Sequence, residues 1–411
     1  MELTTMECRI CGNEELESFL SLGMSPLANN LPSQEDLAEE QPVFPLSVAF
    51  CDTCKLAQLT HVVPPELMFK NYLYVTSTTQ TFRTHFTQMA EDLTRQFKLG
   101  KHSLAVDIGS NDGLLLKGFQ KHGVTTVGVE PADNLAALAN KDGVETINAF
   151  FDHTVAEQII NKYGKADIVT ANNVFAHIHD IKSVVKNVKT LLKDTGVYVT
   201  ESAYFFAMID QLTFDAVYHE HLSYYTLTPL VYFFKHQGME VFKVEQVNTH
   251  GGSIRVYAQK QGGPHKIDAS VPVLLAEEKK KGVERFTTYQ QFGERVYDAQ
   301  KKLLTFLAQA KKEGKTIVGY GVPAKATTLL TFCKATKDTF SYLVDDNPLK
   351  QGRFMPVSHI PIVGSHMLDQ KKPDIVVILA WNFAPEIMQK LAKYKEQGVQ
   401  FVIPLPEPKV L

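Results

Sequence analysis

The chain has 411 residues, 44% of them hydrophobic and 21% charged, which is typical of a soluble protein but exceeds one ordinary domain of roughly 100–200 residues. Its longest apolar run, Ile375–Trp381, is far shorter than the ~20 residues that cross a bilayer, so a membrane partner is excluded. A net charge of −3 without a long block of one sign excludes the electrostatic surface of a dedicated nucleic-acid binder. The amino terminus has no basic region followed by an apolar stretch, so we expect a cytoplasmic location.

Paired cysteines define the first predicted unit, residues 1–80. Four of the five cysteines form two C-x-x-C pairs, Cys8 with Cys11 and Cys51 with Cys54. Together they can complete a tetrahedral Zn²⁺ shell. A disulfide or a redox pair is the alternative, but a reducing cytoplasm disfavours the first and the second needs only one pair beside a βαβ unit. Four sulfur ligands leave no open position, so we expect zinc to fold this turn-rich module without taking part in chemistry.

Two α/β units are predicted to follow, over residues 81–262 and 263–411. In the first, a helix over 81–97 precedes strands at 104–108, 125–129, 168–170 and 197–201 that alternate with helical stretches. This alternation predicts a Rossmann-like parallel sheet with helices on both faces. After a helical connection over 270–312, strands at 316–320, 342–345, 375–379 and 400–403 predict a second Rossmann-like domain.

The first glycine-rich turn follows the strand over 104–108 and indicates a cofactor site. Its spacing is not that of the dinucleotide fingerprint, and an acid before the first glycine suits a polar or cationic ligand better than a pyrophosphate. A further acid ends the next strand, 23 residues later, where a ribose-binding carboxylate belongs. We therefore predict an S-adenosylmethionine site; a plain strand–turn–helix connection is the alternative. The residues assigned to the cofactor are Asp107, Gly109, Ser110, Asn111, Gly113 and Glu130, with Asn172 and Asn173 at the end of the third strand.

A dense group of histidines and tyrosines follows at the same predicted edge of the sheet. His177 comes after the third strand, and Tyr218, Glu220 and His221 belong to the run Tyr-His-Glu-His-Leu. Such a row makes a poor core strand, because each polar side chain would need a buried partner. It favours a proton-transfer site in which a histidine is the base. A surface role or a metal site is the alternative, although no H-E-x-x-H spacing occurs.

A second glycine turn, Gly319-Tyr-Gly321-Val-Pro-Ala-Lys325, opens the last unit. Backbone N–H groups and Lys325 could hold an anion there, which suggests a nucleoside diphosphate. The alternative is that the glycines only pack the helix on the strand. Cys333 is expected to be an inert buried residue.

Taken in order, these motifs resemble those of the sugar C-methyltransferases of deoxysugar biosynthesis. The motifs with this resemblance are the two C-x-x-C pairs, Gly109–Gly113, Glu130-Pro131, Asn172–His177, Glu201, Tyr218–Leu222, His250–Arg255 and Gly319–Lys325. The resemblance implies a zinc-binding domain, a central S-adenosylmethionine domain and a C-terminal domain that helps to hold a nucleotide-linked 4-keto sugar. It also implies methylation at C-3 of a TDP-4-keto-6-deoxyhexose, with another ring carbon or a GDP-sugar as alternatives.

By this resemblance, each site residue receives a role. His221 is the expected base, Glu220 orients it, and Tyr218 and His177 hydrogen-bond the sugar and the developing enolate. Tyr72, or alternatively Tyr74, reaches over the sugar. Ser253, Arg255, Gly321 and Lys325 are assigned to the substrate. A base and a methyl donor on opposite faces of the ring would invert the configuration.

Two other classes of protein were weighed against this interpretation. An RNA methyltransferase with a zinc module that grips RNA is disfavoured by the net charge and by the lack of a Lys/Arg stripe around the cysteines. A non-catalytic nucleotide-sugar binder would not need so many proton-carrying side chains. We expect a monomer.

Overall fold

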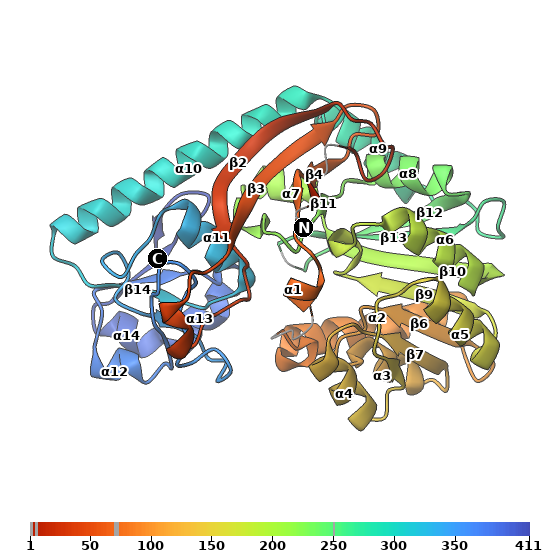
Figure 1. Ribbon diagram of the computed structural model, residues 1–411, viewed down its shortest axis with the longest axis horizontal. Helices are drawn as coiled ribbons and strands as arrows, with labels where there is room; N and C mark the ends of the chain where they lie inside the picture. The colour runs from red at the N-terminus through yellow and green to blue at the C-terminus, as the bar shows by residue number, and fades with distance from the viewer. Residues whose placement is uncertain (1–2, 5–6, 70–73, 250) are drawn as a thin grey trace.

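The computed structural model describes residues 3–4, 7–69, 74–249 and 251–411. Three sheets of four, seven and six strands lie in the N-terminal, central and C-terminal parts of the chain, with a small additional ladder between β1 (Leu3–Thr4) and β5 (His61–Val62) (Figure 1). The predicted α/β architecture is therefore confirmed. Within the described ranges, no helix is long and apolar enough to cross a membrane.

The central sheet has the strand order β12-β13-β10-β9-β6-β7-β8. Its strands are β6 (Leu104–Ile108), β7 (Thr125–Val129), β8 (Thr146–Ile147), β9 (Ala166–Asn172), β10 (Leu192–Ala203), β12 (Met239–Val247) and β13 (Ser253–Lys260). The four predicted strands, β6, β7, β9 and β10, pair in parallel as expected. The sheet is extended beyond them by β13, which pairs antiparallel with both β10 and β12. A connection of only five residues joins β12 to β13, and so short a link permits only antiparallel pairing.

Helices cover both faces of this sheet because its strands are apolar on both sides. Ala105 and Ile168 pack with α2 and α3 on one face, whereas Val106 and Val169 pack with α5, α6 and α8 on the other. The helices are α2 (Gln80–Phe97), α3 (Leu114–Gln120), α4 (Asp133–Lys141), α5 (His153–Tyr163), α6 (Ile181–Leu191), α7 (Phe205–Gln211) and α8 (Leu227–His236). The carboxyl ends of β6, β7 and β9 consequently meet at one edge, where the predicted site residues lie.

The N-terminal sheet is completed by a strand from the central part of the chain. Its order is β11-β4-β3-β2, with β2 (Leu16–Pro26), β3 (Val43–Cys51), β4 (Ala57–Leu59) and β11 (Ser223–Tyr224). In this turn-rich module β2 nevertheless runs for eleven residues and ends at Pro26, which supplies no N–H to continue a ladder. Because β11 follows the Tyr-His-Glu-His-Leu run directly, that run lies against this sheet.

The C-terminal sheet has the order β16-β15-β14-β17-β18-β19 and is parallel except for its last strand. Its strands are β14 (Ile317–Tyr320), β15 (Leu343–Val344), β16 (Ile362–Val363), β17 (Ile375–Ile378), β18 (Gln400–Ile403) and β19 (Lys409–Val410). Its helices are α11 (Ala324–Phe332), α12 (Met367–Gln370), α13 (Ala384–Lys390) and α14 (Ala392–Glu396), and the connection contains α9 (Ser270–Lys280) and α10 (Phe286–Lys312).

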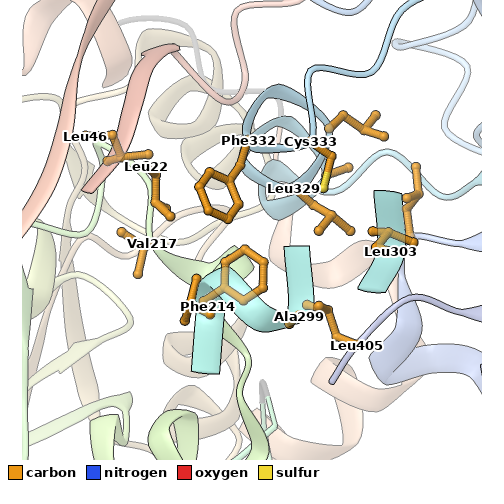
Figure 2. Packing of buried hydrophobic residues seen from close by; sticks show 14 of the residues in the cluster. Leu22, Leu46, Phe214, Val217, Ala299, Leu303, Leu329, Phe332, Cys333 and Leu405 are labelled. Atoms are coloured by element: carbon orange, nitrogen blue, oxygen red, sulfur yellow. The ribbon is translucent and has the colours of Figure 1, made fainter. Parts of the chain in front are cut away.

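One apolar core joins all three parts. Figure 2 shows Leu22 of β2 and Leu46 of β3 facing Phe214 and Val217, with α10 and α11 side chains beside them. Figure 1 shows the β2–β3 hairpin arching beside α10 between the two larger parts. This shared core holds residues 214–222, the segment that carries the predicted base, between the sheets.

Candidate functional site

The turn after β6 requires glycine at two positions. Gly109 and Gly113 have φ angles of +68° and +75°, and a Cβ on either would lie within 2.9 Å of a valine side chain. The contact at Gly109 is with Val174, which belongs to the loop after β9. Asn111 between them is also left-handed, at φ 51°. The turn is thus tightly seated against the loop that leads to His177.

Two buried acids stand at the ends of β6 and β7. The Glu130 carboxylate accepts hydrogen bonds from the backbone N–H of Asn111 at 2.8 Å and of Ala132 at 2.9 Å, which ties the glycine turn to the next strand. A carboxylate can accept about four hydrogen bonds, so it retains capacity for ribose hydroxyls. Asp107 accepts from the Thr170 hydroxyl, and burial raises the pKa of Asp107 to about 7.

Several buried polar atoms at this edge have no hydrogen-bond partner among the described residues. Both amide atoms of Asn172 and one carboxylate oxygen of Asp112 are in this state. Unpaired buried polar atoms are costly, and a polar ligand would satisfy them. The residues therefore fit S-adenosylmethionine. The Ser110 hydroxyl is also unpaired, but it would lie 2.5 Å from a Cβ on Gly128 and so faces β7.

The loop after the N-terminal sheet covers the glycine turn. Asn111 donates to the carbonyl of Tyr74 at 3.1 Å and accepts from the N–H of Thr76 at 2.9 Å. Desolvation and the negative charge of Asp112 raise the pKa of Tyr74, and Tyr74 in turn raises the pKa of Tyr218. Tyr74 thus lies near both the predicted cofactor turn and the histidine cluster. Tyr72 lies outside the described residues.

Three aromatic side chains from two loops form a stack beside this edge. The ring centroids of His177 and His221 lie 5.0 Å apart, and those of Tyr218 and His221 lie 4.0 Å apart. His221 Nδ1 lies 2.7 Å from the carbonyl oxygen of Ala216, and because a carbonyl only accepts, Nδ1 carries the proton. Nε2 is therefore the basic nitrogen of the neutral ring. Phe69 stacks on the other side of His177 at 5.8 Å.

The two neighbours of this stack in the sequence have separate roles. Glu220 is 3% exposed and accepts from the Asn29 side chain at 2.6 Å. Burial and then the Glu220 charge raise the pKa of Tyr218 well above its ordinary value, so Tyr218 keeps its proton. His219 faces the N-terminal sheet, where it contacts Phe44 and the carbonyl of Pro45, and burial lowers its pKa to about 4.

Glu201, at the end of β10, is the centre of a buried ionic network. Arg255 donates to it from Nε and Nη2 at 2.9 and 2.8 Å, and His85 Nε2 lies 2.9 Å from its other oxygen. Burial opposes ionisation, but the hydrogen bond from His85 and the charge of Arg255 outweigh it and lower the pKa of Glu201 to about 2. Ser253 bonds to Thr249, which also donates to Glu201. Arg255 and Ser253, both predicted to bind substrate, thus already have protein partners here.

In the second glycine turn, Gly321 packs against the protein, and Lys325 provides a positive charge close to the turn. A Cβ on Gly321 would lie 2.5 Å from that of Ala380, so the glycine packs β14 against the β17 loop. The Lys325 ammonium lies 4.0 Å from the centroid of the Trp381 ring. Burial lowers the pKa of Lys325, and the charge of the nearby Asp215 carboxylate opposes that shift. Trp381 donates from Nε1 to Asp215 at 2.6 Å.

The four N-terminal cysteines form one cluster, with all four Sγ atoms within 4.8 Å of one another and none in a disulfide. Gly12 and Lys55, which follow the two pairs, both have positive φ, at +76° and +66°, and this closes each knuckle around its sulfurs. Arg9 inside the first knuckle donates to the carbonyls of Leu59 and Leu222. The sulfur set fits a tetrahedral zinc ion. Cys333 is buried, as predicted.

Sequence reasoning missed the residues that hold the cluster in place. Asn29, Ala216, Val174 and Phe69 contact Glu220, His221, Gly109 and His177, respectively. Val174 lies within the Asn172–His177 motif, but as an apolar residue it has no predicted role there. The other three belong to no motif, and the carbonyl of Ala216 has no sequence signal.

Comparison with known proteins agrees with this organisation. Residues 8–69 match the family model described as "Putative zinc binding domain", residues 81–244 match "Methyltransferase domain", and residues 248–406 match "C-methyltransferase C-terminal domain". C-methyltransferase NovU of Streptomyces niveus is 36% identical over 405 residues, which cover 98% of this chain and 96% of that protein. A ubiquinone biosynthesis O-methyltransferase of Coxiella burnetii is 30% identical over 98 residues, 24% of this chain and 41% of that protein.

Solved structures resemble the chain over less than half of its length. The PH0226 protein from Pyrococcus horikoshii covers 46% of this chain and 95% of its own, with a TM-score of 0.37 and 15% identity. An S-adenosylmethionine-dependent methyltransferase from Clostridium acetobutylicum covers 44% and 92%, with a TM-score of 0.35 and 14% identity.

Proposed function

Because the chain belongs to the same family of S-adenosylmethionine-dependent C-methyltransferases as C-methyltransferase NovU, we propose that it methylates a ring carbon of a nucleotide-linked 4-keto-6-deoxy sugar in deoxysugar biosynthesis. The most specific form of the proposal is C-3 of a TDP-4-keto-hexose. The observation that supports it best is the stack of His177, Tyr218 and His221 beside the predicted cofactor turn. A carbon acid next to a carbonyl needs such a base and such hydrogen-bond donors.

The cofactor is assigned to the turn after β6. Gly109–Gly113 would receive its methionine part, Glu130 its ribose hydroxyls, and the unpaired amide of Asn172 a further polar group. When bound, S-adenosylmethionine supplies an electrophilic methyl group. Arg255 would act indirectly, because it holds Glu201 at the edge of the sheet next to Asn172. Ser253 would act through Thr249, which bonds to both Ser253 and Glu201.

His221 would remove the proton at C-3. Nε2 takes the proton, the C–H electron pair moves into the ring to form the enolate, and the negative charge develops on the C-4 oxygen. Tyr218, whose raised pKa keeps it protonated, would donate a hydrogen bond to the C-4 oxygen. His177, which stacks on His221, would be a second hydrogen-bond donor to the sugar. The enolate carbon would then bond to the methyl group as the bond between that group and the sulfonium sulfur breaks, its electron pair goes to sulfur and S-adenosylhomocysteine leaves. The configuration is inverted if His221 and the methyl donor face opposite sides of the ring. Tyr74, or Tyr72, would cover the sugar.

The nucleotide is assigned to the edge of the C-terminal sheet. Lys325 on the Trp381 ring would receive a phosphate of the diphosphate. Trp381 is the single tryptophan of the chain, so its fluorescence should report on nucleotides bound there. The four-cysteine cluster would hold one structural Zn²⁺, and the protein would work as a cytoplasmic monomer.

One incubation tests the proposed function. Protein and methyl-labelled S-adenosylmethionine are mixed with a panel of TDP-, GDP- and CDP-linked 4-keto-6-deoxyhexoses, and label is measured in the recovered sugar. We expect label at C-3 of the TDP sugar. Transfer to none of these sugars would contradict the proposal, and transfer to a GDP sugar or to another carbon would correct its finer part.

A further inference from the structure

Helix α11 of the C-terminal part touches the segment that carries Glu220 and His221, and also the segment that carries Asn29, the hydrogen-bond partner of Glu220. Thr328 donates from its hydroxyl to the carbonyl of Val217 at 2.8 Å, and Thr327 donates to the carbonyl of Ala28 at 3.0 Å. Both threonines are 1% exposed. They are adjacent on one helix but contact residues 111 and 299 positions away in the sequence.

Each of these contacts lies next to a residue that orients the site. Val217 follows Ala216, whose carbonyl accepts from His221 Nδ1, and it precedes Tyr218. Ala28 precedes Asn29, whose amide donates to Glu220. A third contact to the first segment comes from Trp381, which donates to Asp215. The C-terminal part therefore supports the peptide groups on which the orientations of His221 and Glu220 depend.

We propose that Thr327 and Thr328 are positioning residues for the reaction, through which helix α11 holds Glu220 and His221 in register with the substrate. The inference rests on the proposed function. Neither threonine touches the reacting atoms. Lys325, on the first turn of the same helix, is assigned to the diphosphate, so one rigid element fixes both the nucleotide and the base. A misplacement of about 1 Å can cost a hundredfold in rate, which makes such a link consequential.

The proposal predicts a specific kinetic pattern for Thr328→Val. The substitution removes the hydroxyl at nearly constant volume and leaves the buried Val217 carbonyl without its donor. We expect kcat to fall about tenfold while KM for the TDP sugar stays within about twofold, because the mispositioned group is the base. Thr328→Ser keeps the hydroxyl and should restore most of kcat. Thr327→Val should behave in the same way through Glu220.

A second readout isolates the base from methyl transfer. In D₂O, with S-adenosylhomocysteine in place of the methyl donor, His221 should exchange the C-3 proton of the TDP-4-keto-6-deoxyhexose for deuterium, and Thr328→Val should slow this exchange in parallel with kcat. Exchange without protein is subtracted. The matched control is Thr288→Val, which removes a hydroxyl that donates to the carbonyl of Gly282 at 2.7 Å, within the connection between α9 and α10. It should change neither rate.

The outcomes separate the inference from the function beneath it. If the wild-type protein neither methylates nor exchanges the sugar, the proposed function fails. If it does both and folded Thr328→Val and Thr327→Val match its kcat within twofold, only the positioning role is wrong. Binding of S-adenosylhomocysteine, measured by calorimetry, shows which variants are folded. If the valine variants do not fold, Thr328→Ala and Thr327→Ala, which also remove the two hydroxyl donors, decide between the same two results.

Discussion

His219 and His221 are two residues apart, yet their ring nitrogens meet different surroundings. His221 stacks with His177 and Tyr218 at the edge of the central sheet, whereas His219 is 1% exposed and faces Phe44 and Pro45. If His221 is the base, His221→Asn should lower kcat by about a hundred- to ten-thousandfold, the range of general-base catalysis. Affinity for S-adenosylhomocysteine should stay unchanged, and calorimetric titration measures it. Undiminished turnover would remove His221 from the mechanism.

The matched variant, His219→Asn, should keep its turnover, and it should change how the free energy of unfolding depends on pH. Burial lowers the pKa of His219 to about 4, so the folded state binds its proton less readily than the unfolded state, where the pKa is about 6.5. The buried neutral ring of His219 therefore contributes to the free energy of unfolding above pH 6.5. About 3 kcal/mol of this free energy is lost as the pH falls from 6.5 toward 4. Urea unfolding at intervals between pH 7 and 4 should show a shallower decline in the variant. An unchanged slope would contradict this assignment.

At the residue level, the sequence indicates which residues carry chemistry but not how each is oriented. The density of polar groups in the Tyr-His-Glu-His-Leu run marks a site, and the resemblance selects His221. Which nitrogen of His221 carries the proton depends on the carbonyl of Ala216. Every residue has a backbone carbonyl, so the residue type at position 216 does not predict this contact. His177 and His221 are 44 positions apart, and the loops that carry them are joined by a hydrogen bond from the N–H of Leu222 to the carbonyl of Ala176 at 2.9 Å.

At the level of elements, the turn after β6 depends on two properties of glycine that can be tested separately. Gly109 and Gly143 both have positive φ, but a Cβ on Gly109 would lie 2.7 Å from Val174, whereas one on Gly143 would meet nothing within 4 Å. Both alanine variants should lose about 1 kcal/mol of stability from backbone strain. Only Gly109→Ala should also weaken binding of S-adenosylhomocysteine, by tenfold or more, because Val174 must move. Equal affinities in calorimetry would show that the turn does not form the cofactor site.

The zinc knuckle is connected to the candidate site through one side chain. Arg9 donates to the carbonyl of Leu222, directly after His221, and to that of Leu59. We therefore expect the isolated protein to hold about one zinc ion per chain by elemental analysis, and metal removal to abolish turnover without zinc taking part in the chemistry. Arg9→Met should lower kcat while the metal content remains at one. Full activity in metal-free protein would contradict both expectations.

The sequence predicts the first and last residues of a strand correctly where the strand is apolar and flanked by turns. β6 and β7 begin and end at the predicted residues because each is a short buried run before a glycine or an acid. The antiparallel pairing of β13 could not be predicted. A strand that is buried on both faces shows no alternation of apolar and polar residues. β2 shows no regular alternation of buried and exposed residues, because its pairing with β3 shifts register between Ser18 and Leu20 and between Ser21 and Met24.

At the level of the whole molecule, α10 connects the three parts. Gly293 lies so close to β2 that a Cβ there would be 2.2 Å from the backbone oxygen of Phe19. Tyr297 donates to the carbonyl of Ser21, and Gln300 donates to that of Phe332 in the C-terminal part. The shared core runs from Leu22 through Phe214 to Leu405 (Figure 2). None of these contacts could be predicted from the sequence. Those between α10 and β2 join segments more than a hundred positions apart, and the contact with Phe332 depends on how α10 packs in the folded chain.

This shared core predicts that the protein unfolds as one cooperative unit despite its three sheets. Trp381 fluorescence should report on the C-terminal part, release of zinc to a dye on the N-terminal part, and loss of S-adenosylhomocysteine binding on the central part. The three transitions should coincide on heating. Gly293→Ala, which forces α10 away from Phe19, should lower all three midpoints together, whereas Gly100→Ala, where a Cβ would meet nothing within 4 Å, should leave them in place. Separate midpoints for the three probes, or a shift of only one of them in Gly293→Ala, would mean that the parts fold independently and that α10 only links them.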